Sequence, residues 1–267
     1  MKIFDFNNKI AVITGASSGI GKSLATELIT KYNCTVYAVA RNEERLKLVK
    51  DELGEKYVPT PFDVCLEENW QLFAKGLKNS GQSVDILINC AGILPKFKQF
   101  EKSNPEELKR VFDINFFSCV YSCHHLRELI SKNGIVINIS SASALCPFSG
   151  ISAYSASKSA LDRFSTTLAY EQKDFSVTTV LPGFVKTDIM KNQDASKKDK
   201  SLIDKFSANP RKITRKILSK SRKRKKRIVL GIDGKLLGFM YKHFPNIAPK
   251  IIGNFLKKSG LELFSQL

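Results

Sequence analysis

Short apolar runs alternate with helical stretches along most of the 267 residues, and this alternation restricts the possible folds more than any other feature. The expected strands are residues 10–14, 34–40, 57–62, 85–89, 134–140, 176–181 and 227–231. The expected helices are residues 22–32, 42–53, 67–79, 105–130, 153–172 and 210–219. Strands that are apolar throughout are typical of a parallel sheet covered on both faces. The sequence therefore predicts an α/β, doubly wound, mainly parallel seven-stranded sheet with helices on both faces. Ligands should bind beyond the carboxyl ends of its strands.

Composition limits the class of protein. With 43% hydrophobic residues the chain can bury a sizeable core, and without an internal repeat or a Pro/Gly-rich linker residues 1–267 are expected to form one domain. It has no run of 18 or more apolar residues and no secretory signal in residues 1–9, so no transmembrane helix is expected. Six cysteines without a Cys-x-x-Cys pair indicate reduced thiols and a cytoplasmic protein. Three histidines without a plausible ligand set predict no metal site.

A glycine-rich turn, residues 14–21 (Thr-Gly-Ala-Ser-Ser-Gly-Ile-Gly), joins the first expected strand to the first expected helix. Glycines let the backbone turn tightly and approach a pyrophosphate. The start of the helix then offers unpaired N–H groups and a favourable dipole. Because the turn has this strand–turn–helix context, it predicts a dinucleotide site.

Tyr154 and Lys158 are four residues apart on an expected helix and therefore share one face. A tyrosine with its ordinary pKa of about 10 is a poor acid–base catalyst at neutral pH. A nearby ammonium group would lower that pKa, so Tyr154 could exchange a proton with a carbonyl or alcohol oxygen. Ser141, at the end of the fifth expected strand, can donate a hydrogen bond to the developing alkoxide, and Ser140 is the weaker candidate.

Together these motifs resemble the short-chain dehydrogenase/reductase family. The turn matches Thr-Gly-x-x-x-Gly-x-Gly, and residues 89–92 resemble the family's Asn-Asn-Ala-Gly with Cys90 in place of the second Asn. The resemblance covers residues 9–190 and implies a Rossmann fold and a homodimer or homotetramer. It implies that catalysis depends on Tyr154, Lys158, Ser141 and Asn115, the last by positioning a water that leads to the lysine. The implied cofactor contacts are Gly15, Ser17, Ser18, Gly19, Ile20, Gly21, Arg41, Asn42, Asp63, Val64, Asn89, Ala91, Gly92, Tyr154, Lys158, Pro182, Gly183, Val185 and Thr187.

The end of the second expected strand indicates which nicotinamide cofactor is preferred. NAD-preferring proteins place an acidic residue there, which accepts a hydrogen bond from the ribose 2′-hydroxyl. Here Ala40 stands at that position and Arg41 follows it. A carboxylate would repel a 2′-phosphate, whereas Arg41 can bind it through a charge-assisted fork. The sequence therefore predicts NADP(H).

Basic residues are concentrated near the C-terminal end of the chain. Residues 191–227 hold 16 Lys and Arg against 3 Asp and Glu, whereas residues 1–190 hold 22 against 20. By the resemblance, residues 191–227 are expected to be a basic lid over the substrate. Residues 228–267 are expected to hold the last strand and an apolar helical segment.

Three interpretations of residues 211–258 are open. The first is a solvated basic loop whose following apolar helices pack on the domain or on a partner subunit. The second is peripheral contact with an anionic membrane, with Phe239, Tyr241 and Phe244 entering the interface. The third is nucleic-acid binding, which is the weakest because no zinc-finger or base-stacking motif accompanies the basic run.

The expected activity is hydride transfer between NADP(H) and a carbonyl or secondary alcohol carbon of a hydrophobic, steroid-, lipid- or acyl-like substrate. Reduction of a 3-oxoacyl thioester or of a small aldehyde or ketone is one alternative. A non-catalytic cofactor-binding scaffold at a membrane surface is an alternative of another class. The substrate pocket is expected from residues 93–100, 145–151 and 185–209, with Leu94, Leu145, Phe148 and Phe184 as apolar candidates.

Overall fold

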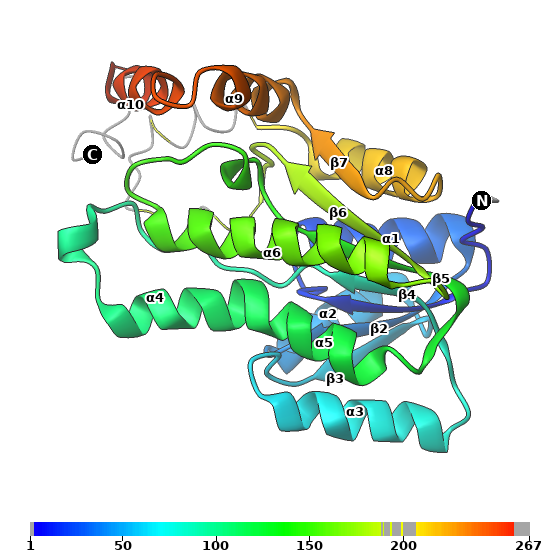
Figure 1. Ribbon diagram of the computed structural model, residues 1–267. Coiled ribbons are helices and arrows are strands. Elements are labelled where there is room, and N and C mark those ends of the chain that lie inside the picture. The colour runs from blue at the N-terminus through cyan, green and yellow to red at the C-terminus, as the bar shows by residue number, and fades with distance from the viewer. Residues whose placement is uncertain (1–2, 188, 190–192, 194–198, 200–206, 259–267) are drawn as a thin grey trace.

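A seven-stranded, entirely parallel sheet with the order β3-β2-β1-β4-β5-β6-β7 forms the centre of the molecule (Figure 1). The computed structural model describes the chain except for residues 1–2, 188, 190–192, 194–198, 200–206 and 259–267. The strands are β1 Ile10–Thr14, β2 Thr35–Ala40, β3 Tyr57–Pro61, β4 Val84–Asn89, β5 Ile130–Ile139, β6 Ser176–Pro182 and β7 Arg227–Leu230. Each lies where the sequence predicts a strand, and the doubly wound fold class is confirmed.

Helices cover both faces of the sheet, because successive strand residues point to opposite sides and both sides are apolar. In β1, Ile13 faces one core cluster and Val12 the other. The first cluster is covered by α1 (Gly19–Tyr32), α2 (Glu43–Leu53) and α8 (Pro210–Ser221). The other side is covered by α3 (Glu67–Asn79), α4 (Pro105–Phe112), α5 (Ser118–Leu126) and α6 (Ser152–Glu171).

The segment expected to be one helix over residues 105–130 is interrupted. A π-helical turn, Asp113–Phe117, separates α4 from α5, and α5 ends at Leu126. Single π turns of this kind interrupt the regular hydrogen-bond ladder and often occur at functional sites. This one carries Asn115, whose buried side chain is used to fix the loop after β4, as described below.

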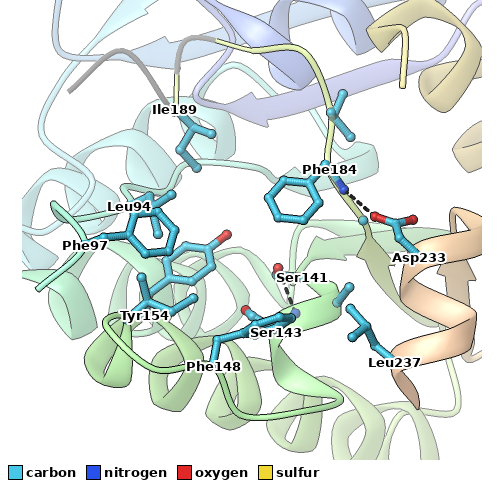
Figure 2. Close-up of a pocket in the computed structure, with 14 residues that line it drawn as sticks. Leu94, Phe97, Ser141, Ser143, Phe148, Tyr154, Phe184, Ile189, Asp233 and Leu237 are labelled. Atoms are coloured by element: carbon cyan, nitrogen blue, oxygen red, sulfur yellow. Dashed lines mark hydrogen bonds between the residues drawn. The ribbon is translucent and has the colours of Figure 1, made fainter. Parts of the chain in front are cut away.

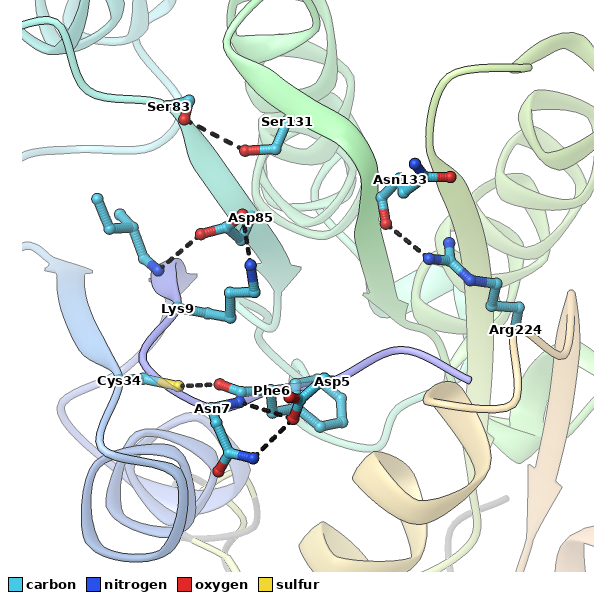
Figure 3. Close-up of polar contacts among 11 residues, drawn as sticks. Asp5, Phe6, Asn7, Lys9, Cys34, Ser83, Asp85, Ser131, Asn133 and Arg224 are labelled. Atoms are coloured by element: carbon cyan, nitrogen blue, oxygen red, sulfur yellow. Dashed lines mark hydrogen bonds and ion pairs between the residues drawn. The ribbon is translucent and has the colours of Figure 1, made fainter. Parts of the chain in front are cut away.

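The basic run, residues 222–227, is partly built into the fold. Arg224 donates hydrogen bonds to the Asn133 carbonyl oxygen (2.7 Å, Figure 3) and to Ser176 Oγ (2.9 Å). Arg227 donates two hydrogen bonds to the carboxylate of Asp162, at 3.1 and 2.8 Å. Ahead of the run, α8 packs on α1 and buries apolar side chains in the first core cluster. Helix α8, Arg224 and Arg227 thus belong to the fold, although most of the basic run is exposed. The lid over residues 191–227 stays a prediction, and most of residues 191–209 lie outside the described residues.

Two further helices, α9 (Ile232–His243) and α10 (Ala248–Lys258), lie next to one another at the edge of the molecule (Figure 1). Gly234 and Gly238 let α9 approach Ala142 and Leu145 closely. In the membrane interpretation Tyr241 would enter the interface, but it packs inward against the cluster of Cys146, Ala248 and Ile252. Within the described part of the chain, no helix is both long and apolar enough to span a bilayer.

Candidate active site

The glycine-rich turn between β1 and α1 is shaped for close contact with a ligand. Gly15 has a φ of +68°, which disfavours other residues, and its N–H donates to the Val39 carbonyl oxygen at 2.8 Å. A Cβ on Gly21 would collide with the backbone of Gly15, so the helix can start this close to the turn only with glycine there. Ser18 precedes the helix in an extended conformation and makes no side-chain capping bond in the described structure. The first N–H groups of α1 therefore remain available to an anion.

Two adjoining cavities run from this turn across the carboxyl ends of the strands, and together we call them the nucleotide cleft. They share Gly15, Arg41, Arg45, Ala91, Gly92 and Ile93. The cofactor residues expected from the sequence that line the cleft are Gly15, Ser17, Ser18, Gly19, Ile20, Gly21, Arg41, Asn42, Asp63, Val64, Ala91, Gly92, Tyr154, Lys158, Pro182, Gly183, Val185 and Thr187.

Asn89 is the one expected cofactor residue outside this lining. Its Nδ2 donates to Asn138 Oδ1 at 2.8 Å, and its Oδ1 accepts from Ser122 Oγ at 2.6 Å. The buried side chain therefore ties β4 to β5 and α5 behind the cleft, and a contact between Asn89 and the cofactor stays a prediction.

Two arginines stand at one end of the nucleotide cleft. Arg41 lies 3.9 Å from the Asp63 carboxylate, with 56% of its side chain exposed. Arg45, which the sequence analysis missed, lines both parts of the cleft. Asn42 accepts a hydrogen bond from the Arg45 N–H (2.7 Å) and thereby caps α2. The signal that could have identified Arg45 is its place in the first turn of the helix that follows Arg41.

A second, apolar cavity adjoins the cleft and is shown in Figure 2; we call it the apolar pocket. Its lining consists of Leu94, Phe97, Ser141, Ala142, Ser143, Phe148, Ile151, Tyr154, Gly183, Phe184, Val185, Ile189, Asp233 and Leu237. Three of the four expected pocket residues line it. The fourth, Leu145, does not: it lies beneath α9, against Gly238. Asp233 and Leu237 were not expected from the sequence, because only the placement of β7 beside β6 brings the start of α9 to the pocket.

Tyr154 and Ser141 line both the nucleotide cleft and the apolar pocket. Burial raises the pKa of Tyr154, and a hydrogen bond with Ser141 only partly offsets this. The expected lowering of that pKa by Lys158 is not found, because burial of the phenol dominates. Ser140, the weaker serine candidate, instead donates its hydroxyl to the Lys158 carbonyl oxygen at 2.7 Å.

Lys158 is 4% exposed and lines the cleft. Its Nζ donates to the Ile139 carbonyl oxygen at 3.0 Å. Burial lowers its pKa to about 8, although the thiols of Cys90 and Cys119 act in the opposite direction. The buried ammonium group is therefore easier to deprotonate than an ordinary lysine.

Asn115 fixes the loop after β4. Its Oδ1 accepts from the Ile93 N–H at 2.8 Å, and its Nδ2 donates to the Ile93 carbonyl oxygen at 3.0 Å. The same Nδ2 lies 3.1 Å from Ser157 Oγ on α6. The side chain thus joins the π-helical turn, the loop and α6. Its role in positioning a water stays a prediction.

Asp233 connects α9 to the turn after β6. Its Oδ2 accepts from the Phe184 N–H at 2.8 Å (Figure 2). The carboxylate is wedged between Gly183 and Gly231, and a Cβ on either glycine would collide with it. Asp233 is the one charged side chain in the described lining of the apolar pocket.

The comparisons agree with this site. A family model described as short chain dehydrogenase matches residues 9–198. The chain belongs to the short-chain dehydrogenase/reductase family. It is 38% identical over 202 residues to "11-beta-hydroxysteroid dehydrogenase-like 2" of Arabidopsis thaliana, an alignment covering 71% of this chain and 64% of that protein. It is 36% identical over 187 residues to "Uncharacterized oxidoreductase YIR035C" of Saccharomyces cerevisiae, covering 69% of this chain and 73% of that protein.

Solved structures of short-chain dehydrogenases show the same fold. A short chain dehydrogenase/reductase from Burkholderia phymatum, solved in complex with NAD, is similar with a TM-score of 0.82. It shares 18% of its sequence with this chain, over 91% of this chain and 96% of that one. As a short-chain dehydrogenase/reductase, the protein is a member of an oxidoreductase family. The match to the family model ends before α8, β7, α9 and α10.

Proposed function

We propose that this short-chain dehydrogenase/reductase transfers a hydride between NADP(H) and the carbonyl or secondary alcohol carbon of a hydrophobic substrate. One observation carries the proposal: Tyr154 and Ser141 line both the nucleotide cleft and the apolar pocket. A carbonyl group bound in the apolar pocket would therefore meet two hydroxyl groups at the boundary with the cofactor. A reduced nicotinamide, when bound, supplies the hydride.

The residues of the cleft fit a nicotinamide dinucleotide. The glycines of the β1–α1 turn leave room for a pyrophosphate, and the N-terminus of α1 provides donors for it. The guanidinium groups of Arg41 and Arg45 can bind a 2′-phosphate, which supports the preference for NADP(H) over NAD(H).

The protonation state of Tyr154 is the one that reduction of a carbonyl group uses. The raised pKa of Tyr154 keeps its phenol protonated at neutral pH, so it can donate a proton to the carbonyl oxygen. Ser141 donates a hydrogen bond to the same oxygen as negative charge develops on it. Lys158, buried beside Gly92, is placed to hold the nicotinamide ribose.

The apolar pocket supports a steroid-, lipid- or acyl-like substrate. Its described lining is mostly apolar, and a relative at 38% identity is named as 11-beta-hydroxysteroid dehydrogenase-like. A 3-oxoacyl thioester or a small aldehyde or ketone is the alternative. We further propose that the protein is cytoplasmic and forms a homodimer or homotetramer, that residues 1–267 are one domain, and that residues 191–209 cover the bound substrate.

The test is NADPH oxidation with ketosteroids, keto-lipids, 3-oxoacyl thioesters and aldehydes. Tyr154→Phe should remove turnover with every active substrate and leave NADPH binding unchanged, since the ring stays but the proton donor is lost. Full activity of that variant would overturn the mechanism and leave a scaffold role for the site.

Arg41→Asp tests the cofactor preference. It should lower the ratio of kcat/KM with NADPH to kcat/KM with NADH by about 100-fold or more, because it removes a cation and adds a repelling carboxylate. Arg211→Asp, which makes the same charge change on α8, is the matched control and should leave the ratio unchanged. An unchanged ratio in Arg41→Asp would refute the NADP(H) assignment.

A further inference from the structure

Large apolar side chains are exposed on α9, on α10 and on the connection between them. These residues, which we call the outer face, are Ile232, Leu236, Phe239, Phe244, Ile247 and Ile251, each at least half exposed. Figure 1 shows the two helices adjacent to one another, with the rest of the protein on one side of them. Apolar patches of this kind on a folded protein mark interaction surfaces.

The outer face follows from the helical spacing of the sequence. Ile232, Leu236 and Phe239 are separated by four and three residues, so they lie along one side of α9. Leu237 and Tyr241 lie on the opposite side and pack toward the domain. The helix is therefore apolar on both sides, and burial in the domain accounts for one side only.

Positive charge lies on the same two helices as the outer face. Lys235, Lys242 and Lys250 are exposed on the same two helices. Asp233 is the single carboxylate between residues 228 and 258, and it is turned inward to the Phe184 N–H. On the neighbouring α8, burial and then the ammonium groups of Lys235 and other lysines lower the pKa of Lys220. This surface therefore carries a surplus of cations and favours an anionic partner.

The positive charge beside the outer face also distinguishes between the two partners that could cover it, a second copy of the chain and a lipid surface. A second copy of the chain related by a twofold axis would place the same cations against each other, which disfavours a contact between copies. An anionic lipid surface offers apolar depth for Phe239 and Leu236 and negative headgroups for the lysines around them.

The same helix that carries the outer face also forms part of the wall of the apolar pocket. Leu237, next to the exposed Leu236, lines that pocket, and Asp233 holds the first turn of α9 against the segment after β6. The pocket that we assign to the substrate is thus one helix thickness from the outer face.

We propose that the outer face docks on an anionic lipid surface and that the apolar pocket takes its carbonyl substrate from that surface. The second half rests on the proposed function. Docking does not require catalysis, so the two can fail separately. The lysines of both helices would keep the helices at the lipid surface, while Phe239 and Phe244 enter the headgroup region.

Flotation of the full chain with vesicles tests the docking. At low ionic strength the protein should float with vesicles of phosphatidylcholine and phosphatidylserine, and much less with phosphatidylcholine alone. The double variant Leu236→Ser/Phe239→Ser should lower the partition coefficient about tenfold or more, because two apolar side chains no longer enter the interface. Lys235→Glu/Lys242→Glu should lower it on the anionic vesicles only.

The matched control is Leu48→Ser/Leu72→Ser, which changes two leucines on α2 and α3 that are 63% and 67% exposed. It removes as much exposed apolar surface elsewhere and should leave vesicle binding unchanged. Wild-type protein that does not float with anionic vesicles would overturn the proposal. Equal loss of vesicle binding in Leu236→Ser/Phe239→Ser and in Leu48→Ser/Leu72→Ser would also overturn it. A change in the mass of the Leu236→Ser/Phe239→Ser variant in solution, without vesicle binding by the wild type, would assign the face to a contact between copies.

Turnover tests the delivery of substrate. NADPH oxidation should be measured with a long-chain ketone held in anionic vesicles and with a short water-soluble ketone. The Leu236→Ser/Phe239→Ser variant should lose rate with the vesicle-borne ketone and keep it with the soluble one. Equal rates for wild type and variant with both ketones would overturn lipid delivery. If the wild type oxidises NADPH with neither ketone, the proposed function is refuted. The docking proposal is then tested by vesicle flotation alone.

Discussion

Replacing Lys158 with Met is expected to stabilise the folded protein while abolishing its activity. Burial lowers the pKa of the Lys158 ammonium group from 10.5 to about 8. A shift of this size corresponds to about 3 kcal/mol spent on holding the charge in the folded state. Met keeps the length of the side chain without the charge, but it loses the hydrogen bond to the Ile139 carbonyl oxygen, which contributes about 1 kcal/mol. The variant should therefore be about 2 kcal/mol more stable at neutral pH.

The stability gained by Lys158→Met should decrease as the pH rises. Below the folded pKa of about 8, Lys158 is protonated in both states, and the folded protein carries the whole cost. Between about 8 and 10.5 the folded protein releases this proton while the unfolded chain keeps it. The stability of the wild type therefore rises through this window, and the advantage of Lys158→Met should shrink and largely disappear near its upper end.

Urea unfolding measures both effects. The single tryptophan, Trp70, is fully buried and reports unfolding by its fluorescence. The free energy of unfolding is compared for wild type and Lys158→Met at neutral pH and at steps up to the ordinary lysine pKa. Lys212→Met, at an exposed position of α8, is the matched control and should show no pH-dependent gain. A Lys158→Met protein that is less stable than wild type at neutral pH, or a difference that stays constant with pH, would refute the burial argument.

Asp233→Ala should weaken NADPH binding about tenfold, because the Phe184 N–H loses a charged acceptor beside the expected nicotinamide site, and Asp233→Asn should restore most of it. Adenosine 2′,5′-bisphosphate, which lacks the nicotinamide, should bind all three proteins equally in the same titration; a parallel loss for this fragment would contradict the role. Arg224→Ala should lower the free energy of unfolding by about 1–2 kcal/mol through the lost bonds to Asn133 and Ser176, whereas Lys225→Ala, at the exposed neighbour, should change it by less than about 0.5 kcal/mol. Equal effects in urea unfolding would show that the basic run is solvated after all.

The sheet could be predicted from the sequence because each strand is apolar on both faces. Ile13 and Val12 are adjacent and serve opposite cores, so the whole run must be apolar, and such runs are easily recognised. The glycine turn and the Tyr154–Lys158 pair were equally accessible, since their chemistry depends on short spacings along the chain.

Other features depend on contacts between distant segments, and no local pattern indicates them. Asp233 reaches the pocket only because β7 pairs with β6, and Arg224 is bound to the fold only because the loop before β7 meets the carbonyl of Asn133. The pKa of Tyr154 was predicted in the wrong direction because the sequence shows the neighbouring Lys158 but not the burial of the phenol. The π-helical turn at Asn115 could not be predicted for a similar reason: Ile93, which the Asn115 side chain binds, lies in the loop after β4.

The position of the Asp233 carboxylate between Gly183 and Gly231 also constrains how these three residues can change during evolution. The carboxylate fills the space that two side chains would need, so none of the three positions can change freely while the others stay. Among relatives that keep this β7–α9 connection, the three should be inherited as one unit and lost together. A relative with a larger residue at either glycine should lack the aspartate as well.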